Sequence, residues 1–354
     1  MIVTVTPNPA VDLTWHVPKI VPGATHRAEA GVARAGGKGL NVARVAHAQG
    51  APVLALATVG GPTGAELAEE LVASGVPHEL LAVRGATRRS IALVDEDLGD
   101  TTVINERGVN PSAEEWAALT EAVVRALGRD GEAEDATDGR GAAAGRRRRR
   151  PVLVLSGSLP PGAPEDLLPS LIRAGRKAGA VVIADTSGPA LLRAADAGAT
   201  VLKPNADELA EATGIADPLD GALELLRRGA SLILLSQGAD GMLAITSDVI
   251  VRARLAVPLA GNPTGAGDAA VAACAVLMAE GITEPEAILR RATSWSAAAV
   301  LMPLAGEIDP SWTELESELI VEHPAVTALR PPSAPRFASA PPLGRTPDDP
   351  RLRP

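Results

Sequence analysis

Short apolar runs recur along this chain, and each is followed by a polar or glycine-containing loop and then by a segment of helical character. The runs lie within residues 53–59, 152–155, 180–185 and 231–236, and residues 200–205 are expected to form a further strand. Such runs are typical of strands that are buried on both faces of a parallel sheet. Strands that alternate with helices predict an α/β fold with a doubly wound, mostly parallel sheet. Residues 242–245 and 249–256 are expected to form an antiparallel edge.

Ligands of such sheets bind beyond the carboxyl ends of the strands, so the glycine-rich loops matter most. Residues 261–268 read Gly-Asn-Pro-Thr-Gly-Ala-Gly-Asp and precede a small-residue segment that we expect to be helical. Backbone amides at such a helix start favour an anion. Asp268 would repel a resting phosphate, but it suits a base that takes the proton of a hydroxyl attacking that phosphate. The alternative interpretation is a helix N-cap, which this octapeptide alone supports equally well.

A second stretch has the same design. Residues 35–43 read Ala-Gly-Gly-Lys-Gly-Leu-Asn-Val-Ala and lie about 230 residues before the first. Together the two stretches resemble the paired signatures of the ribokinase-like, PfkB-type sugar kinases, and Gly50 and Gly60 also fit the spacing of the earlier signature. The resemblance implies a ribokinase-like kinase domain over residues 1–323, with a small β-sheet lid from about 9–35 and 86–107.

Composition indicates which segments lack a fold of their own and which classes of partner are disfavoured. Residues 128–150 are of low complexity and end in five arginines, so we expect a disordered insert there, and residues 324–354 read as a disordered Pro-rich tail. The arginines 146–150 could instead form an anionic-surface or nucleic-acid patch. A net charge of −10 argues against a general nucleic-acid binder. No apolar run reaches the roughly 18 residues of a membrane span, and the single Cys274 suits a reducing compartment. These features predict a cytoplasmic protein without nucleic-acid or membrane partners.

The resemblance also assigns roles on the acceptor side of the site. It makes Asp268 the catalytic base, with an anion hole built from the amides of Gly265, Ala266 and Gly267. The positions that match the family's sugar-binding residues are Asp12, Gly37, Lys38 and Asn41, and weaker candidates for this side are Glu106 and Ser158. The alternative interpretations are a turn-stabilising Asp12 and a solvated Lys38.

The resemblance implies ATP as the co-substrate and Mg²⁺ as the cofactor. Residues that resemble nucleotide contacts are Lys203, Asn205, Ser236, Gly238 and Gly241. Glu208 completes the family's Asn-x-x-Glu element, which is associated with Mg²⁺ and phosphate, and Mg²⁺ usually keeps several waters, so few direct carboxylate ligands are needed. The alternative interpretation of this element is an ordinary helix start with acidic residues.

Arg27 and Arg88 bear on the class of acceptor, since a sugar phosphate needs guanidinium groups and a neutral sugar does not. Thr87-Arg88 resembles the hexose-phosphate branch of the family, whereas Thr264 is closer to the ribokinase form. The resemblance implies ATP-dependent phosphorylation of a ketohexose phosphate, with fructose 1-phosphate as the expected acceptor and fructose 1,6-bisphosphate as the product. Fructose 6-phosphate and tagatose 6-phosphate stay open as acceptors.

More distant alternatives are a kinase of an unphosphorylated sugar and a sugar-phosphate-binding regulator without catalysis. Asp268 argues against the second, because a regulator has no need of a base. The family often dimerises through the lid, so the resemblance suggests a homodimer as the protein partner.

Overall fold

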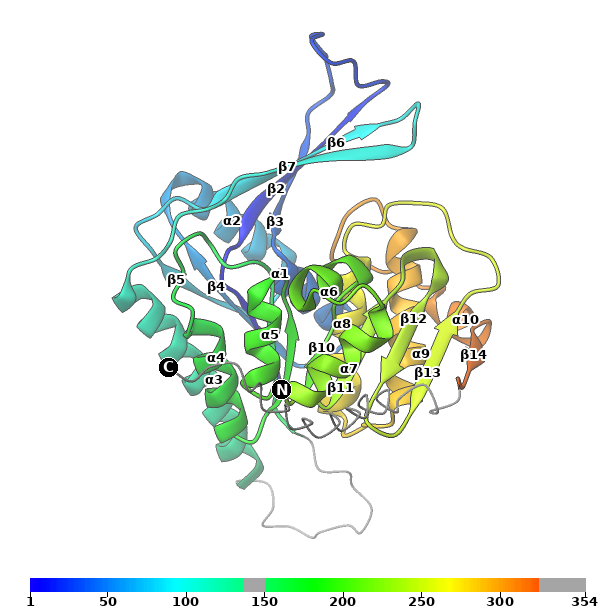
Figure 1. The fold of residues 1–354 in the computed structure, drawn as a ribbon. Coiled ribbons are helices and arrows are strands. Elements are labelled where there is room, and N and C mark those ends of the chain that lie inside the picture. Colours follow the sequence, from blue (N-terminus) through cyan, green and yellow to red (C-terminus); the bar gives the residue numbers. More distant parts are fainter. Residues whose placement is uncertain (136–149, 325–354) are drawn as a thin grey trace, which may run out of the picture.

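A ten-stranded sheet forms the centre of the molecule in the computed structural model, which describes residues 1–135 and 150–324 (Figure 1). Seven of its strands run parallel, and the order across the sheet is β5 (His78–Ala82), β4 (Val53–Val59), β1 (Ile2–Thr6), β8 (Val152–Ser156), β9 (Val181–Asp185), β10 (Val201–Leu202) and β11 (Leu232–Ser236). The antiparallel edge consists of β12 (Met242–Ile245), β13 (Ile250–Arg254) and β14 (Ile320–Glu322). The predicted doubly wound, mostly parallel sheet is confirmed.

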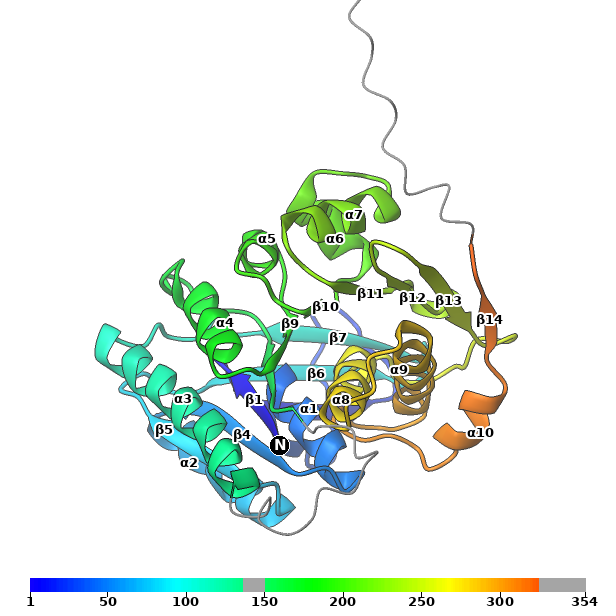
Figure 2. The ribbon, with the colours of Figure 1, turned by 90° about the horizontal axis from the view of Figure 1, so that it is seen from below.

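Helices cover both faces of this sheet, as Figure 2 shows. One layer contains α3 (Ala113–Asp135), α4 (Leu167–Lys177), α5 (Pro189–Asp196), α6 (Ala206–Thr213) and α7 (Pro218–Arg228). The other contains α1 (Lys38–Ala48), α2 (Gly61–Ser74), α8 (Ala266–Ala279) and α9 (Pro285–Val300), and α10 (Trp312–Ser317) packs on α9. Strand β8 shows why two cores form, because Val152 and Val154 face one layer while Leu153 and Leu155 face the other.

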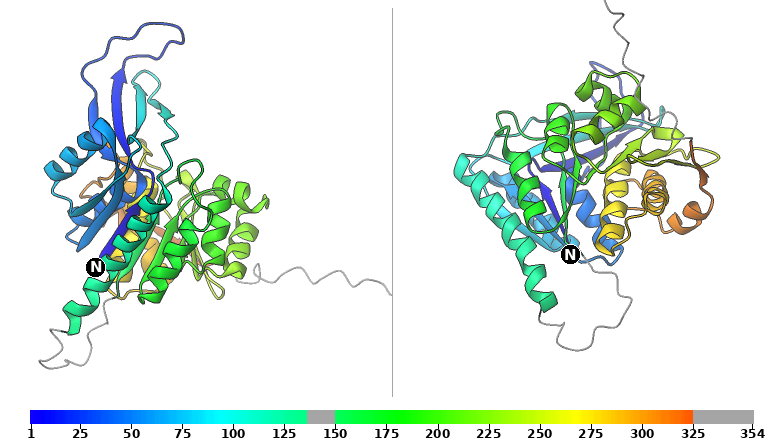
Figure 3. Two further views of the ribbon diagram at one scale, coloured as in Figure 1. Left: turned by 90° about the vertical axis from the view of Figure 1, so that its left-hand side faces the viewer. Right: turned by 60° about the horizontal axis from the view of Figure 1, so that its bottom comes forward.

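A separate four-stranded sheet projects from one end of the molecule (Figure 3). Its order is β3 (Val32–Gly36), β2 (Ala10–Val17), β6 (Arg88–Asp95) and β7 (Asp100–Asn105). Residues 87–94 and 101–105 read as two strands around a turn, and β6–β7 is the antiparallel hairpin that this pattern predicts. This small sheet corresponds to the expected lid, and it continues directly from the central strand β1.

Several element boundaries differ from the prediction. The sequence predicts a helix over residues 65–74 after the turn at 60–64, but α2 begins at Gly61, because Pro62 at the first turn of a helix costs no hydrogen bond. The sequence also predicts a helix over residues 311–320, but α10 is shorter than this, and residues 320–322 form β14. Helix α3 continues to Asp135 and so extends into the segment where the sequence predicts an insert.

The remaining predictions on residues 136–149 and 325–354 lie outside the described residues. These include most of the low-complexity insert, four of the five arginines 146–150 and the Pro-rich tail. No helix within residues 1–135 and 150–324 has the length and apolar character needed to cross a membrane.

Candidate active site

The start of α8 provides a site for an anion. Gly265 is the N-cap residue of this helix, its φ of 87° lies in the left-handed region, and no side chain caps the helix. The Ala266 amide donates to the carbonyl of Pro263 at 3.2 Å, which leaves the Gly265 and Gly267 amides as the better candidates for an anion hole. Asp268 lies within the first turn and is 5% exposed, so the alternative interpretation of Asp268 as the N-cap is wrong.

The two glycine-containing stretches meet at this helix start. Asn41, in the first turns of α1, donates from its side-chain amide to Asp268 Oδ2 at 2.8 Å, and both side chains are buried. Helices α1 and α8 pack along each other in the same layer, which holds this pair in place. The contact joins residues 227 positions apart in the sequence. One place in the molecule therefore combines a helix N-terminus with a carboxylate held by an amide.

Two lysines and two further carboxylates surround this pair. Lys38 Nζ lies 3.2 Å from Asp185 Oδ2 and 3.8 Å from Glu208 Oε1. Lys203 Nζ lies 3.4 Å from the other oxygen of Asp185. An added Cβ on Gly267 would lie only 3.2 Å from Lys203 Nζ, so this ammonium faces the start of α8. The cluster places two cations where a phosphate at the helix N-terminus would lie.

Asp185 is a member of this cluster that the sequence reasoning missed. It was assigned to a strand without a role, although it is a carboxylate at the carboxyl end of a buried parallel strand. Ser156 Oγ also donates to it at 3.3 Å. A fully buried carboxylate keeps its charge only when it is paired, and here Lys203 and Lys38 provide that pairing.

The cluster sets the pKa values of its own members. Burial, followed by the charge of Asp185, raises the pKa of Asp268 to about 7, although Lys38, the Asn41 hydrogen bond and Lys203 act in the opposite direction. Burial also opposes ionisation of Asp185, but the two lysines outweigh it and hold its pKa below the ordinary value. Burial would lower the pKa of Lys38, yet the neighbouring carboxylates raise it. Asp268 is thus the carboxyl group whose proton is exchanged near neutral pH.

The lid strands bring Asp12 to the same region. An added Cβ on Gly36 would lie 1.9 Å from Asp12 Oδ2, so only glycine leaves space for this carboxylate. Gly37, the N-cap residue of α1 with a φ of 111°, donates a backbone hydrogen bond to Asp12. Burial raises the pKa of Asp12 to about 6, against the charges of Arg88 and Arg34. Asp12 therefore has charged partners, and the interpretation as a simple turn residue does not account for them.

Arg88 is the predicted arginine that reaches this carboxylate. Its Nε donates to the carbonyl of Asn8 at 3.2 Å and its Nη1 to the carbonyl of Glu106 at 3.3 Å. The Glu106 side chain is exposed and accepts from the backbone of Arg89, so it points to β6. Arg27 lies in the exposed connection between β2 and β3, and no described contact joins it to the other predicted residues.

The predicted nucleotide-side residues lie at or just beyond the ends of β10 and β11. Asn205 and Glu208 form a reciprocal capping box at the start of α6, with distances of 2.8 and 3.0 Å. Asn205 and Glu208 thus form the helix start of the alternative interpretation, but Glu208 Oε1 also faces Lys38, which a helix start does not require. Ser236 pairs with Asn205 across a β-bridge, and the short turn that follows contains Gly238 and Gly241. Ser158, the weaker acceptor-side candidate, is exposed in the loop after β8.

A divalent cation would find few protein ligands here. Within the described residues, no three His, Cys, Asp or Glu side chains gather as a metal site. Glu208 is the carboxylate that suits Mg²⁺, because one of its oxygens is free of the capping box and Mg²⁺ retains most of its water.

Comparison with known proteins identifies the family. Residues 8–135 and 148–312 match the pattern of the pfkB family carbohydrate kinases. The chain is 33% identical over 319 residues to a 1-phosphofructokinase of Xanthomonas campestris pv. campestris, covering 87% of this chain and 93% of the relative. Phosphofructokinase-2 of Escherichia coli, solved in complex with fructose-6-phosphate, is 28% identical with a TM-score of 0.73, covering 89% and 97% of the two chains. Arabidopsis thaliana ribokinase shares the fold at 22% identity and a TM-score of 0.66, covering 89% and 98%.

Proposed function

The chain belongs to the pfkB family of carbohydrate kinases, and we propose that it phosphorylates fructose 1-phosphate with ATP to give fructose 1,6-bisphosphate. The observation that carries this proposal is the Asn41–Asp268 hydrogen bond at the uncapped start of α8, beside Lys38 and Lys203. A base, an anion site and two cations are the parts that phosphoryl transfer needs.

Each group of residues in the site has its own role in phosphoryl transfer. The oxygen of the acceptor hydroxyl forms a bond to the γ-phosphorus of ATP as the bond between that phosphorus and the β-phosphate oxygen breaks. The proton of the hydroxyl passes to Asp268. The amides at the start of α8 and the two lysines stabilise the charge on the transferred group. Bound Mg²⁺, held through water by Glu208, would neutralise charge on the ATP phosphates.

A phosphorylated acceptor is favoured by the lid arginine. Arg88 is close enough to Asp12 to lower its pKa, so a hydroxyl-binding carboxylate and a phosphate-binding guanidinium lie together. Fructose 1-phosphate is preferred because the relative at 33% identity is a 1-phosphofructokinase. Fructose 6-phosphate is the second candidate, because the E. coli structure at 28% identity contains it.

We also propose that the lid pairs with the lid of a second copy. The edge strand β7 exposes Val103 and Ile104, which are 46% and 53% accessible, and β3 exposes Val32. Apolar side chains on an open sheet edge favour pairing. An ATP-dependent enzyme with one unpaired cysteine is proposed to work in the cytoplasm.

An acceptor assay tests the proposed function. The purified protein is incubated with ATP and Mg²⁺ against fructose 1-phosphate, fructose 6-phosphate, tagatose 6-phosphate and free fructose. We expect the highest kcat/KM for fructose 1-phosphate and almost none for free fructose. Faster turnover of free fructose would refute the role of Arg88, and no turnover of any sugar would refute the kinase proposal.

A further inference from the structure

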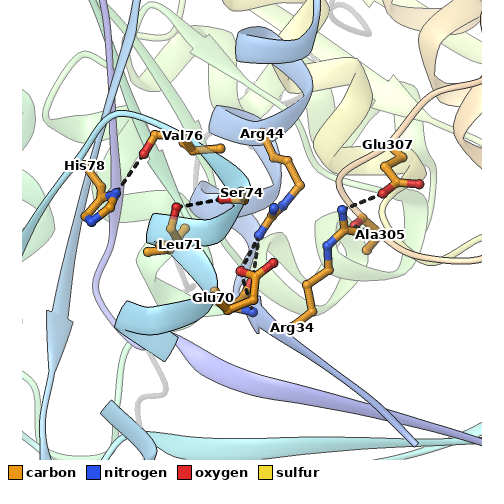
Figure 4. Close-up of polar contacts among 10 residues, drawn as sticks. Arg34, Arg44, Glu70, Leu71, Ser74, Val76, His78, Ala305 and Glu307 are labelled. Carbon is orange, nitrogen blue, oxygen red and sulfur yellow. Dashed lines mark hydrogen bonds and ion pairs between the residues drawn. The ribbon is translucent and has the colours of Figure 1, made fainter. Parts of the chain in front are cut away.

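Two arginine–glutamate pairs join the lid to the body of the molecule (Figure 4). Arg34, in lid strand β3, donates from Nη1 to the carbonyl of Ala305 at 2.9 Å and from Nη2 to Glu307 Oε1 at 2.5 Å. Arg44, in α1, donates to Glu70 Oε2 at 2.8 Å, and the same oxygen accepts the Ala35 amide of β3 at 3.1 Å. Strand β3 is therefore tied to α1, to α2 and to residues 305–307.

Residues 305–307 lie beside Asn41 and beside the Gly265 turn that begins the helix of Asp268. An added Cβ on Gly265 would lie 2.8 Å from the Ala305 side chain, so Ala305 packs against the start of α8. An added Cβ on Gly306 would lie 3.3 Å from Asn41 Oδ1. Interiors packed this closely transmit displacement. A shift of this segment would therefore move the Gly265 turn, the Asn41 amide or both.

The other end of this connection is the acceptor side of the site. Arg34 lies directly opposite Asp12 in the antiparallel β2–β3 pair, and residues opposite each other project to the same face. The charge of Arg34 lowers the pKa of Asp12, which agrees with that placement. The Arg34 side chain is only 15% exposed. It thus lies between the carboxylate assigned to the sugar and the segment that packs against the start of α8.

Glu307 belongs to a different surface. With Arg34, Arg44, Glu70 and Gly306 it lines an open groove of about 440 Å³, and the lining includes no residue assigned above to the sugar or to ATP. Its carboxylate can therefore be altered without removing a substrate contact. A variant of Glu307 thus changes the bonds of Arg34 and leaves the predicted substrate contacts in place.

We propose that Arg34 is a positioning residue: its bonds to Ala305 and Glu307 couple the lid to the Asn41–Asp268 pair, so that the base is aligned when the lid holds the acceptor. This inference rests on the proposed kinase function and deepens it. Arg34 acts through Asp12 and through residues 305–307 and takes no part in bond making.

Four variants test this coupling: Arg34→Gln, Arg34→Lys, Glu307→Gln and the double variant Arg34→Gln/Glu307→Gln. We expect Arg34→Gln and Glu307→Gln each to lower kcat with fructose 1-phosphate by about tenfold or more, within the range for misplaced reacting groups. The double variant should be no slower than the slower single variant, because both remove one connection. Arg34→Lys, which keeps the charge, should recover part of the loss, and the KM for ATP should stay unchanged.

The matched control is Arg173→Gln, which removes an exposed ion pair with Asp166 on the opposite helix layer and should leave kcat unchanged. Wild-type kcat in both single variants, with only a lower melting temperature, would reduce Arg34 to a structural residue and overturn the proposal. A higher KM for the sugar in Arg34→Gln, together with unchanged kcat and KM in Glu307→Gln, would also overturn the proposal, because Arg34 would then be a substrate contact. The wild-type rate in the same assay distinguishes failure of the Arg34 coupling from failure of the proposed kinase function, since an inactive wild type refutes the kinase function as well.

Discussion

Asp268 is a carboxylic acid in surroundings that oppose its charge. Burial and the nearby Asp185 raise its pKa to about 7, while the Asn41 hydrogen bond lowers it. A base with a pKa near the working pH is both available and strong enough to take a proton. The same burial that makes Asp268 costly for the fold therefore makes it suitable for catalysis.

The pH dependence of Asn41→Ala follows from this balance. Loss of the Asn41 hydrogen bond should raise the pKa of Asp268 further, because that bond favours the charged form. In the wild type, kcat/KM should rise as the pH increases through about 7, and in Asn41→Ala this rise should move to higher pH. The phosphate of the sugar also titrates near pH 6, but the variant cannot move that step. An unmoved profile would separate Asp268 from the observed titration.

Arg88 offers a second test at the scale of single residues. Arg88→Ala should weaken binding of the sugar phosphate by roughly 1.5–3 kcal/mol, as expected for a lost hydrogen bond to a charged group. The adjacent Arg89, which pairs with Glu66, provides the matched variant Arg89→Ala, and its KM should stay unchanged. Equal KM values for Arg88→Ala and the wild type would remove Arg88 from the site.

At the scale of elements, the start of α8 depends on glycine. Gly265 has a φ of 87° and Gly75, at the end of α2, a φ of 70°, but only Gly265 has a neighbour where a Cβ would stand. Each alanine substitution should cost about 1–2 kcal/mol for the left-handed backbone. Gly265→Ala should cost about 1–3 kcal/mol more from crowding and should also lower kcat. Urea unfolding and turnover of both variants check this, and equal losses would mean that the contact with Ala305 is unimportant.

The sequence was sufficient for elements with a strong local signal. Runs such as residues 152–155 are apolar on both faces and can only be buried strands, and the glycine turns before α1 and α8 indicate where helices begin. It failed where local signal is weak. Strand β14 is three residues long and forms only by pairing with β13, so tertiary contact decides it. The role of Asp185 likewise depends on Lys38 and Lys203, which reach it from distant elements.

At the scale of the whole molecule, the lid is the element with an exposed apolar edge. If two lids pair, Ile104→Glu should shift sedimentation from dimer to monomer, because a buried charge would oppose association. Val72→Glu, on the surface of α2 at 70% exposure, is the matched control and should leave the assembly unchanged. A wild-type monomer at working concentrations, or a dimeric Ile104→Glu, would contradict the proposed lid pairing.

The convergence of two distant stretches on one carboxylate is also a property of the whole fold. The folded protein holds the Asp268 proton up to about pH 7, well above the ordinary value of 3.8, so the free energy of unfolding falls as the pH rises from 3.8 to about 7 and the loss is complete above that. Asp268→Asn should therefore be at least as stable as the wild type at pH 8, with no gain at pH 3. Melting temperatures at the two pH values thus show whether the variant is folded when its activity is measured.

The most direct measurement is the turnover of Asp268→Asn with ATP and fructose 1-phosphate at pH 8. Because the amide cannot accept the proton of the acceptor hydroxyl, kcat should fall by at least ~10²-fold, the lower end of the range for loss of a general base. Turnover close to that of the wild type by this folded variant would contradict the assignment of Asp268 as the base.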